Sequence, residues 1–455
     1  MTDWIGAPLE ETEGTWPEPL TPFPGKEKRD ASPRPQPQRG FTQTYRASEG
    51  RGLARTGTIH TPHGQIKTPA FIPVGTKADV KGMLPEMVLG LGAQAVLANA
   101  YHLYLQPGSD IVEQAGGFGR FMHWPGPTYT DSGGFQVLSM GAGFKKVLSE
   151  EFAASKAENE EAVKERARAI EKESRAVVDE GGVTFRSHID GTSHRFTPET
   201  SIGIQHQLGA DIMFAFDELT SLSHSRQYQE ESLERTERWA RQCLREHRRL
   251  TDLHPERPYQ QLWGVVQGAD YQDLRVKAAR DLAQMDEDGQ SFDGFGIGGA
   301  LRKEDLGEIV SWVTPELPED RGRHLLGISE PFDLFEAVNA GIDTFDCVNP
   351  TRVARNGGIY TPDGRYNITN ARFTADFGPL AEGCGCYTCT NFSRAYVKHL
   401  FKAKEILAST LATIHNLWFT VRLVDAIGQA VTDGRFVEFR EDALQRFYGP
   451  NLPGR

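Results

Sequence analysis

YTDSGGFQVL, at residues 129–138, contains the pattern on which the fold depends. The β-prone approach to Asp131 predicts a strand, and Ser132 with two glycines follows directly. A glycine pair after a strand supplies a backbone angle that other residues avoid, or it lets another group approach the backbone closely. The alternative is a tight turn into a helix, with Asp131 as the helix cap. The remaining sequence is needed to choose between these two interpretations.

Short apolar runs of this kind recur between residues 68 and 350, each ending in polar or glycine residues, with helix-like segments between them. Continuous apolar strands that alternate with helices predict a parallel sheet covered on both faces. Eight such strands predict the α/β class and a (β/α)8 TIM barrel, and a doubly wound sheet is the alternative if one run is miscounted. The runs are TPAFIPVGT (68–76), AQAVLAN (93–99), PTYTDSGG (127–134), ADIMFAFDE (210–218), LWGVVQG (262–268), FDGFGIGG (292–299), HLLGIS (324–329) and DTFDCVNP (343–350).

The carboxyl ends of the barrel strands surround the active site in this architecture. We therefore expect three carboxylates, two amides and several glycines to meet on one rim. The glycines after Asp131 would then let a flat ligand approach the backbone. The rim residues are Asn99, Asp131, Asp217, Gln267, Gly298, Gly299, Gly327 and Asp346.

Composition limits the function classes. The chain has 455 residues and a net charge of −12, so any nucleic-acid binding requires a local basic patch. No apolar run reaches the length of a membrane span, and the acidic start of the chain does not resemble a signal peptide. We expect a soluble, cytoplasmic protein.

Two regions lie outside the alternating pattern. Residues 1–40 hold eight prolines and predict a disordered tail, although Trp4, Trp16 and Phe23 are candidates for docking on the body. Residues 141–180 hold eight basic and ten acidic residues and predict a solvated helical insertion, with gripping of RNA as the alternative. After it, residues 183–199 alternate around an Asp-Gly turn and predict a β-hairpin over the rim.

CGCYTC at residues 384–389 predicts a metal site. Three clustered cysteines in a chain with five suggest metal binding rather than disulfides. Three thiolates and one imidazole close a tetrahedral zinc site, which makes the zinc structural. Spacing alone leaves His399 and His415 open as the fourth ligand, and reduced free cysteines are the alternative. The isolated Cys243 and Cys347 are expected to be packing residues.

A basic lobe is predicted beside the rim. Residues 384–424 contain five Lys or Arg and only one acid, and Arg352 and Arg355 follow the last predicted strand. A local basic surface on an acidic protein is typical of a nucleic-acid site. A solvated helix face is the alternative. The five basic residues are Arg394, Lys398, Lys402, Lys404 and Arg422.

In this order, DSGGFQ, FDE, VVQG, GIGG, FDCVNPTR and the Cys-x-Cys-x2-Cys…His set resemble the bacterial tRNA-guanine transglycosylases, also called queuine tRNA-ribosyltransferases. The resemblance runs from about residue 43 to residue 448; the tail and the charged insertion lie outside it. It implies a (β/α)8 barrel over 41–350, a zinc-binding, tRNA-contacting subdomain over 351–418, and C-terminal helices over 419–455 that complete the barrel. It also implies a homodimer.

The activity that the resemblance implies is exchange of the wobble guanine of tRNA for a 7-deazaguanine, in bacteria 7-aminomethyl-7-deazaguanine for queuosine biosynthesis. Asp346 would be the nucleophile and Asp131 the general acid/base. Arg352 and Arg355 would contact the anticodon loop, and His415 would be the fourth zinc ligand. The base would contact Asp217, Gln267, Gly299, Ala300, Phe135, Ser132 and Asn99.

The chemistry is consistent with these residue types. Two carboxylates can break a glycosidic bond with retention, one attacking the sugar and the other handling the proton on the leaving base. Asp217 can accept from the N–H groups of a guanine edge, Gln267 can donate to its carbonyl, and Phe135 can stack on it. The wobble base must leave its stack to react.

Two departures put the identity of the inserted base in doubt. Leu219 stands where a pocket cysteine is usual, and residues 300–303 differ in the loop that faces the 7-substituent. The serious alternative is therefore the same reaction with another deazaguanine. A non-catalytic partner subunit and a sugar glycosidase are weaker rivals, because the nucleophile and zinc ligands are present and no Trp lies in the strand-end signatures.

Overall fold

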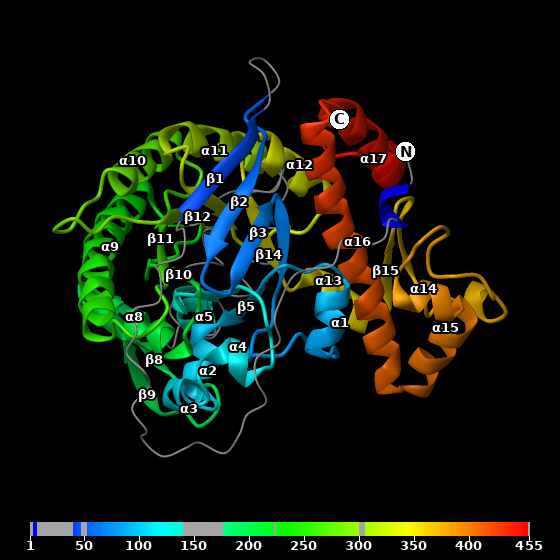
Figure 1. The fold of residues 1–455 in the computed structure, drawn as a ribbon, viewed down its shortest axis with the longest axis horizontal. Coiled ribbons are helices and arrows are strands. Elements are labelled where there is room, and N and C mark those ends of the chain that lie inside the picture. Colours follow the sequence, from blue (N-terminus) through cyan, green and yellow to red (C-terminus); the bar gives the residue numbers. More distant parts are fainter. Residues whose placement is uncertain are drawn as a thin grey trace.

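The computed structural model describes residues 3–6, 40–46, 52–139, 176–222, 224–299 and 305–453. Its centre is an eight-stranded parallel sheet in the order β4-β14-β13-β12-β11-β10-β6-β5 (Figure 1). A bridge between Val74 and Leu97 joins the two ends of that order, so the sheet closes into a barrel. All eight predicted strands are present: β4 (Ala70–Pro73), β5 (Val96–Asn99), β6 (Thr128–Asp131), β10 (Ile212–Phe214), β11 (Gln261–Val266), β12 (Gly294–Ile297), β13 (Gly322–Leu325) and β14 (Thr344–Cys347).

Helices follow the strands and cover the outside of the barrel (Figure 1). The long α9 is amphipathic, with Leu233, Trp239 and Leu244 buried and its charged residues toward solvent. These helices are α1 (Pro85–Gly90), α2 (Ala100–Leu105), α3 (Ser109–Gln114), α4 (Phe118–Phe121), α5 (Gly134–Ser139), α8 (Pro198–Leu208), α9 (Arg226–Leu253), α10 (Gln272–Ala283), α11 (Leu306–Val313), α12 (Pro331–Asn339) and α13 (Asn349–Arg355), and a short 3-10 turn, η3 (Thr314–Glu316), follows α11.

A small antiparallel sheet closes the amino-terminal mouth of the barrel. It consists of β1 (Gly40–Arg46), β2 (Arg55–Thr61) and β3 (Gly64–Thr68). Its Phe41, Ile59 and Ile66 share one core with residues of the barrel strands. The ring of His63 lies 2.7 Å from the carboxylate of Asp211, just ahead of β10. The opposite, carboxyl-end mouth is therefore the place for a site.

The predicted hairpin is confirmed as β8 (Gly182–Arg186) and β9 (Ser193–Phe196), which pair antiparallel. A third strand, β7 (Val177–Asp179), pairs with β8. The expected helical insertion 141–180 is thus wrong at its last residues, because the segment that enters the hairpin is already extended. The remainder of that insertion, through residue 175, lies outside the described residues.

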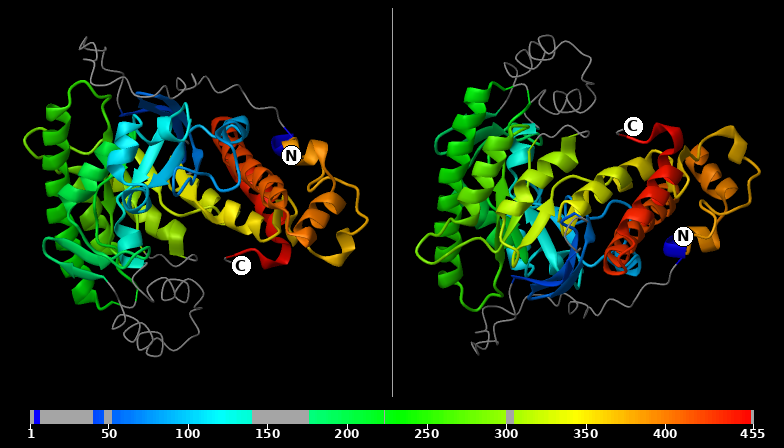
Figure 2. Two further views of the ribbon diagram at one scale, coloured as in Figure 1. Left: turned by 90° about the horizontal axis from the view of Figure 1, so that it is seen from below. Right: turned by 90° about the horizontal axis from the view of Figure 1, so that it is seen from above.

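A metal lobe stands beside the barrel, and the long helix α16 (Ile406–Thr432) joins the two (Figure 2). The lobe has its own apolar core, which includes Ile359, Phe373 and Val397. The expected boundary at 418/419 falls inside α16, so one helix belongs to both parts. The lobe consists of β15 (Gly358–Thr361), β16 (Gly364–Asn367), η4 (Ala371–Phe373), α14 (Tyr387–Asn391) and α15 (Arg394–Ala403), while α17 (Phe436–Tyr448) and η5 (Gly449–Asn451) follow α16.

The first described turn of the chain, η1 (Asp3–Ile5), packs on α16. Ile5 is buried, and its carbonyl accepts hydrogen bonds from the Trp418 indole (2.6 Å) and from the backbone N–H of Gly385 (3.2 Å). The ring of Trp4 meets Phe419 edge-on at 5.3 Å. These residues dock on the body, as considered for Trp4, whereas the sequence placed them in a disordered tail; residues 7–39 lie outside the described residues.

No helix within the described residues combines the length and the apolar character that crossing a membrane requires.

Candidate active site and metal centre

Asp131 ends β6, and four donors surround its carboxylate. Asn99, its register partner on β5, donates through its side-chain amide. The backbone N–H groups of Ala100 and Gly133 donate at 3.0 and 3.2 Å, and Gln136 Nε2 donates at 3.2 Å. Asn99 also caps α2 by accepting from the following turn. The start of α2 therefore fixes the position of Asp131.

The two glycines after Ser132 are required by protein contacts. Gly133 has φ +79°, and a Cβ there would lie 3.0 Å from the ring of Phe196 in the hairpin. A Cβ on Gly134 would lie 2.9 Å from the carbonyl oxygen of Asp217. Part of the close approach predicted from the sequence is therefore made by the hairpin and by Asp217 after the neighbouring strand, and the approach of a flat ligand stays a prediction.

Burial raises the pKa of Asp131 from its ordinary value to about 7. The negative charge of Asp346 acts in the same direction, which places both acids within electrostatic reach on one rim. The donors from Ala100, Gly133 and Asn99 oppose the shift without cancelling it. A carboxyl group with this pKa can both give and take a proton near neutral pH.

Asp217 follows β10 and is nearly buried. Its two oxygens accept from Ser132 Oγ at 3.3 Å and from Gln267 Nε2 at 2.5 Å. Burial raises its pKa to about 6, against these two hydrogen bonds. Gln267 Oε1 is buried without a hydrogen-bond partner among the described residues. In this orientation of the amide Nε2 is engaged by Asp217 and Oε1 is the atom without a partner, so donation by Gln267 to the carbonyl of a base stays a prediction.

Gly299 lies at the end of the strand β12 run with φ +101°. A Cβ at this position would lie 2.7 Å from Gln267 Oε1 and 2.8 Å from Arg275 Nη2, so only glycine fits. Arg275, a buried residue that the sequence analysis did not select, donates to the carbonyl of Gly298 at 2.7 Å. Nothing in the helical pattern around Arg275 indicated that its side chain would bond to the backbone of the rim. Ala300 lies outside the described residues.

Asp346 lies in β14, with its side chain partly exposed at the rim. Its Oδ1 accepts from the backbone N–H of Gly327 at 3.0 Å and faces His324 Nε2 at 3.1 Å. Within the described part of the chain, its Oδ2 has no hydrogen-bond partner. One carboxylate with a free oxygen and a second that holds a proton near pH 7 suit covalent attack with proton transfer.

Phe135 and Arg352 are exposed, and Arg355 is half-buried. Phe135, in the first turn of α5, is 47% exposed and free to stack on a ligand. Arg352 and Arg355 lie on α13 directly after β14, and neither forms an ion pair with any described residue. Burial lowers the pKa of Arg355, and repulsion by Arg352 adds to this. Two unpaired cations next to the rim suit a phosphate backbone.

Two of the five basic residues in the predicted basic lobe form ion pairs with acids. Arg394 is paired with Asp376 and Glu382, and Arg422 is paired with Asp425. The sequence window excluded these acids because they lie just outside it. The remaining Lys398, Lys402 and Lys404 have no ion pair among the described residues.

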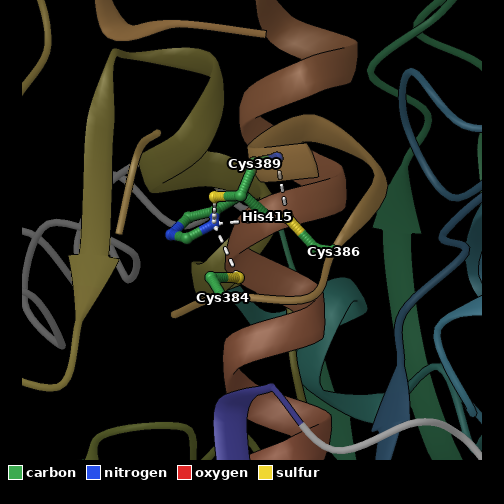
Figure 3. A group of neighbouring side chains, drawn as sticks. All are labelled: Cys384, Cys386, Cys389 and His415. Carbon is green, nitrogen blue, oxygen red and sulfur yellow. Dashed lines mark hydrogen bonds between the residues drawn. The ribbon is translucent and has the colours of Figure 1, made fainter. Parts of the chain in front are cut away.

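Cys384, Cys386, Cys389 and His415 form one cluster, with all four ligand atoms within 4.8 Å of one another (Figure 3). The sulfur atoms lie 3.6, 3.5 and 3.3 Å from His415 Nδ1. The choice that spacing left open is therefore decided for His415 over His399. Cys384, Cys386 and His415 are buried, and α16 carries the histidine to the loop that holds the cysteines.

The orientation of His415 fits metal binding. Its Nε2 lies 2.7 Å from the carbonyl oxygen of Tyr360, which can only accept, so Nε2 carries the proton and Nδ1 is free toward the sulfurs. Cys386 Sγ also accepts from the Cys389 backbone N–H at 3.4 Å. Three sulfurs and one imidazole can hold a metal ion here. Cys243 is buried apart from the cluster, where it accepts from the Phe216 N–H.

A family model described as "Queuine tRNA-ribosyltransferase" matches residues 49–171 and 167–449. The two matches meet inside the charged segment that the sequence analysis set apart.

Curated proteins give the same family. The queuine tRNA-ribosyltransferase of Pelotomaculum thermopropionicum is 44% identical over 409 residues, which cover 90% of this chain and 99% of that protein. That of Symbiobacterium thermophilum is 45% identical over 398 residues, covering 87% and 88% of the two chains. That of Fusobacterium nucleatum is 41% identical over 409 residues, covering 89% and 98%.

Proposed function

The chain belongs to the queuine tRNA-ribosyltransferase family, and from this membership we propose that it exchanges the wobble guanine of tRNA for 7-aminomethyl-7-deazaguanine in queuosine biosynthesis. The reaction would pass through a covalent ribosyl-enzyme intermediate. The observation that supports this mechanism most is the contrast between the two rim acids. Asp131 is enclosed by donors with a pKa of about 7, whereas Asp346 keeps one oxygen free.

In the first step, Oδ2 of Asp346 attacks C1′ of the wobble ribose and the bond from C1′ to N9 breaks. The electron pair leaves with guanine, which takes a proton from Asp131. In the second step, N9 of the incoming base gives its proton to Asp131 and attacks C1′, and the carboxylate of Asp346 is released. Each step inverts C1′, so the exchange proceeds with overall retention.

The base edge is assigned to Asp217 and Gln267, with the backbone of Gly299 and Ala300. Asp217 accepts from the N–H groups of a guanine-like edge, and the amide that holds it now would turn to the base. Ser132 holds the second oxygen of Asp217, and Asn99 contributes by holding Asp131. Phe135 would stack on the base.

Arg352 and Arg355 would contact the anticodon loop. Neutral substitutions at both positions test this, because each lost phosphate contact flattens the salt dependence of tRNA binding by about one unit of slope. An unchanged slope would contradict the assignment.

The cluster of Cys384, Cys386, Cys389 and His415 would hold a structural zinc, because four protein ligands leave no coordination position open for chemistry. The active form would be a cytoplasmic homodimer. An aromatic surface beside the metal loop supports this, since Phe392 stacks on Tyr396 at 5.4 Å and Phe377 is 81% exposed. A monomeric mass in sedimentation at micromolar concentration would contradict the dimer.

The alternative is the same reaction with a different 7-deazaguanine, such as the queuine in the names of the relatives. Leu219 borders the pocket residues in place of a cysteine, and residues 300–303 lie outside the described chain. A sugar glycosidase is disfavoured, since Trp124 and Trp263 near the strand ends are buried and offer no sugar platform.

The deciding experiment incubates the protein with tRNA that carries labelled wobble guanine and offers several candidate bases in turn. We expect 7-aminomethyl-7-deazaguanine to displace the label. Without an incoming base, denaturing gels should trap a protein–RNA adduct in wild type and none in Asp346→Asn, which still binds tRNA. No label release with any base would contradict the function, and an adduct in Asp346→Asn would place the nucleophile elsewhere.

A further inference from the structure

His324 lies inside the barrel next to Asp346. It is in β13, where it pairs in register with Thr344 of β14, and it is fully buried. Its ring centroid is 5.2 Å from that of Phe214 and 5.6 Å from that of Tyr129. Because residues two apart on a strand share a face, Thr344 and Asp346 both face this imidazole.

Both ring nitrogens of His324 are engaged. Nδ1 lies 2.9 Å from Thr344 Oγ1, and Nε2 lies 3.1 Å from Asp346 Oδ1. A carboxylate only accepts hydrogen bonds, so Nε2 carries a proton and donates. In the neutral imidazole Nδ1 then accepts from the Thr344 hydroxyl. The hydrogen-bond network thus fixes the tautomer of this histidine.

These contacts give the two oxygens of Asp346 different hydrogen-bond environments. Oδ1 receives two donors, His324 Nε2 and the Gly327 N–H, and Oδ2 receives none from the described residues. Two donors on one oxygen stop the carboxylate from rotating.

We propose that His324 is a positioning residue for the nucleophile: it holds Oδ1 of Asp346 so that Oδ2 alone attacks the ribose. This rests on the proposed function. When Oδ2 forms its bond to C1′, the C1′–N9 bond breaks and the guanine leaves with the electron pair. Oδ1 becomes the ester carbonyl and keeps both donors. When the incoming base attacks, the C1′–Oδ2 bond breaks, its electrons return to the carboxylate, and the same donors stabilise that charge.

Three substitutions separate this role from core packing. His324→Phe keeps a flat ring between Phe214 and Tyr129 but removes both hydrogen bonds. His324→Asn places an amide near the Nδ1 position, so it retains the Thr344 contact and loses that to Asp346. His324→Gln reaches the Nε2 position and keeps a donor for Asp346.

The measurement is kcat and KM for tRNA in the base-exchange assay, with the melting temperature of each variant. We expect kcat to fall between about tenfold and a hundredfold in His324→Phe and His324→Asn, because the attacking oxygen is no longer held in line. KM for tRNA should change little. His324→Gln should recover kcat to within about threefold of wild type.

Equal losses of kcat in His324→Asn and His324→Gln would overturn the proposal in favour of packing, and so would wild-type kcat in His324→Asn. If His324→Phe does not fold, the Asn and Gln pair still decides. Failure of the proposed function gives a different result, since wild type itself would then release no labelled guanine and form no adduct.

Discussion

The rim of the barrel and the metal cluster are built in opposite ways. The rim brings together residues from Asn99 to Asp346, on strands far apart in the sequence, and it leaves polar atoms unused. Gln136 Oε1 and Gln267 Oε1 are buried without hydrogen-bond partners in the described chain, and two acids have raised pKa values. The cluster draws on residues 384–389 and one helical histidine, whose second nitrogen is satisfied by Tyr360.

This difference agrees with the two proposed roles, chemistry at the rim and stability at the cluster. Unsatisfied groups and raised pKa values cost folding free energy, and their grouping around one mouth of the barrel marks that mouth as a candidate functional site. With a metal ion bound, the four residues of the cluster would leave no coordination position open and would join the cysteine loop to α16. Substitutions at the rim should therefore change rates, and substitutions in the cluster should change stability.

The largest effect is expected in the cluster. Cys386→Ser should lose the metal ion and destabilise the metal lobe by several kcal/mol, because binding free energy at a structural zinc site is folding free energy. Metal analysis and thermal unfolding measure both. Cys243→Ser is the matched control, a buried cysteine outside the cluster that should keep the metal. Full metal content and normal stability in Cys386→Ser would remove the distinction between the two regions.

Next in size is the base edge. Asp217→Asn should lower kcat/KM for base exchange by about 2–4 kcal/mol of transition-state stabilisation, because an acceptor in the pocket becomes a donor. Its melting temperature should not fall. Ser132→Ala removes only one hydrogen bond to the same carboxylate and should lose much less. Unchanged kinetics in Asp217→Asn would place this residue outside the pocket.

A smaller effect is expected from pH. Burial raises the pKa of Asp131 to about 7, so its protonated form, needed to protonate the departing guanine, is lost as pH rises through that value. The rate of adduct formation without incoming base should fall about tenfold per pH unit above pH 7. Asp131→Asn, which has no proton to lose there, should show no such limb. A wild-type rate that stays level to pH 9 would contradict this.

The sequence predicted the strands well, because buried parallel strands are apolar on both faces and end in recognisable polar residues. It also predicted a metal site at the three cysteines, because three cysteines within six residues have few other uses, but their spacing left the fourth residue open between His399 and His415. It did not find His324 or Arg275. Their roles depend on which residues of neighbouring strands and helices meet, and one chain without its topology does not contain that information.

The glycines after Ser132 show a second limit. The sequence predicted that some group lies close to the backbone at Gly133 and Gly134. Only the structure shows that Phe196 and Asp217 lie there. Helix α16 is a different case. The sequence over 401–424 already predicts an amphipathic helix that carries His415, so the boundary drawn at 418/419 disagreed with the helical pattern, and the structure places both sides in one helix.

The hydrogen bond from Trp418 to the carbonyl of Ile5 joins residues 413 positions apart. During synthesis on the ribosome, Trp4 and Ile5 emerge long before their partners Phe419 and Trp418, which follow nearly the whole barrel in the sequence. Gly385, next to the cysteines of the cluster, donates to the same carbonyl, so this contact of the cysteine loop also forms only when Ile5 docks. The entropy lost in closing so long a loop grows only with the logarithm of its length. The long separation therefore affects the sequence of folding events more than it affects the free energy of folding. Assembly of the metal centre and docking of the first turn are therefore expected among the last events of synthesis.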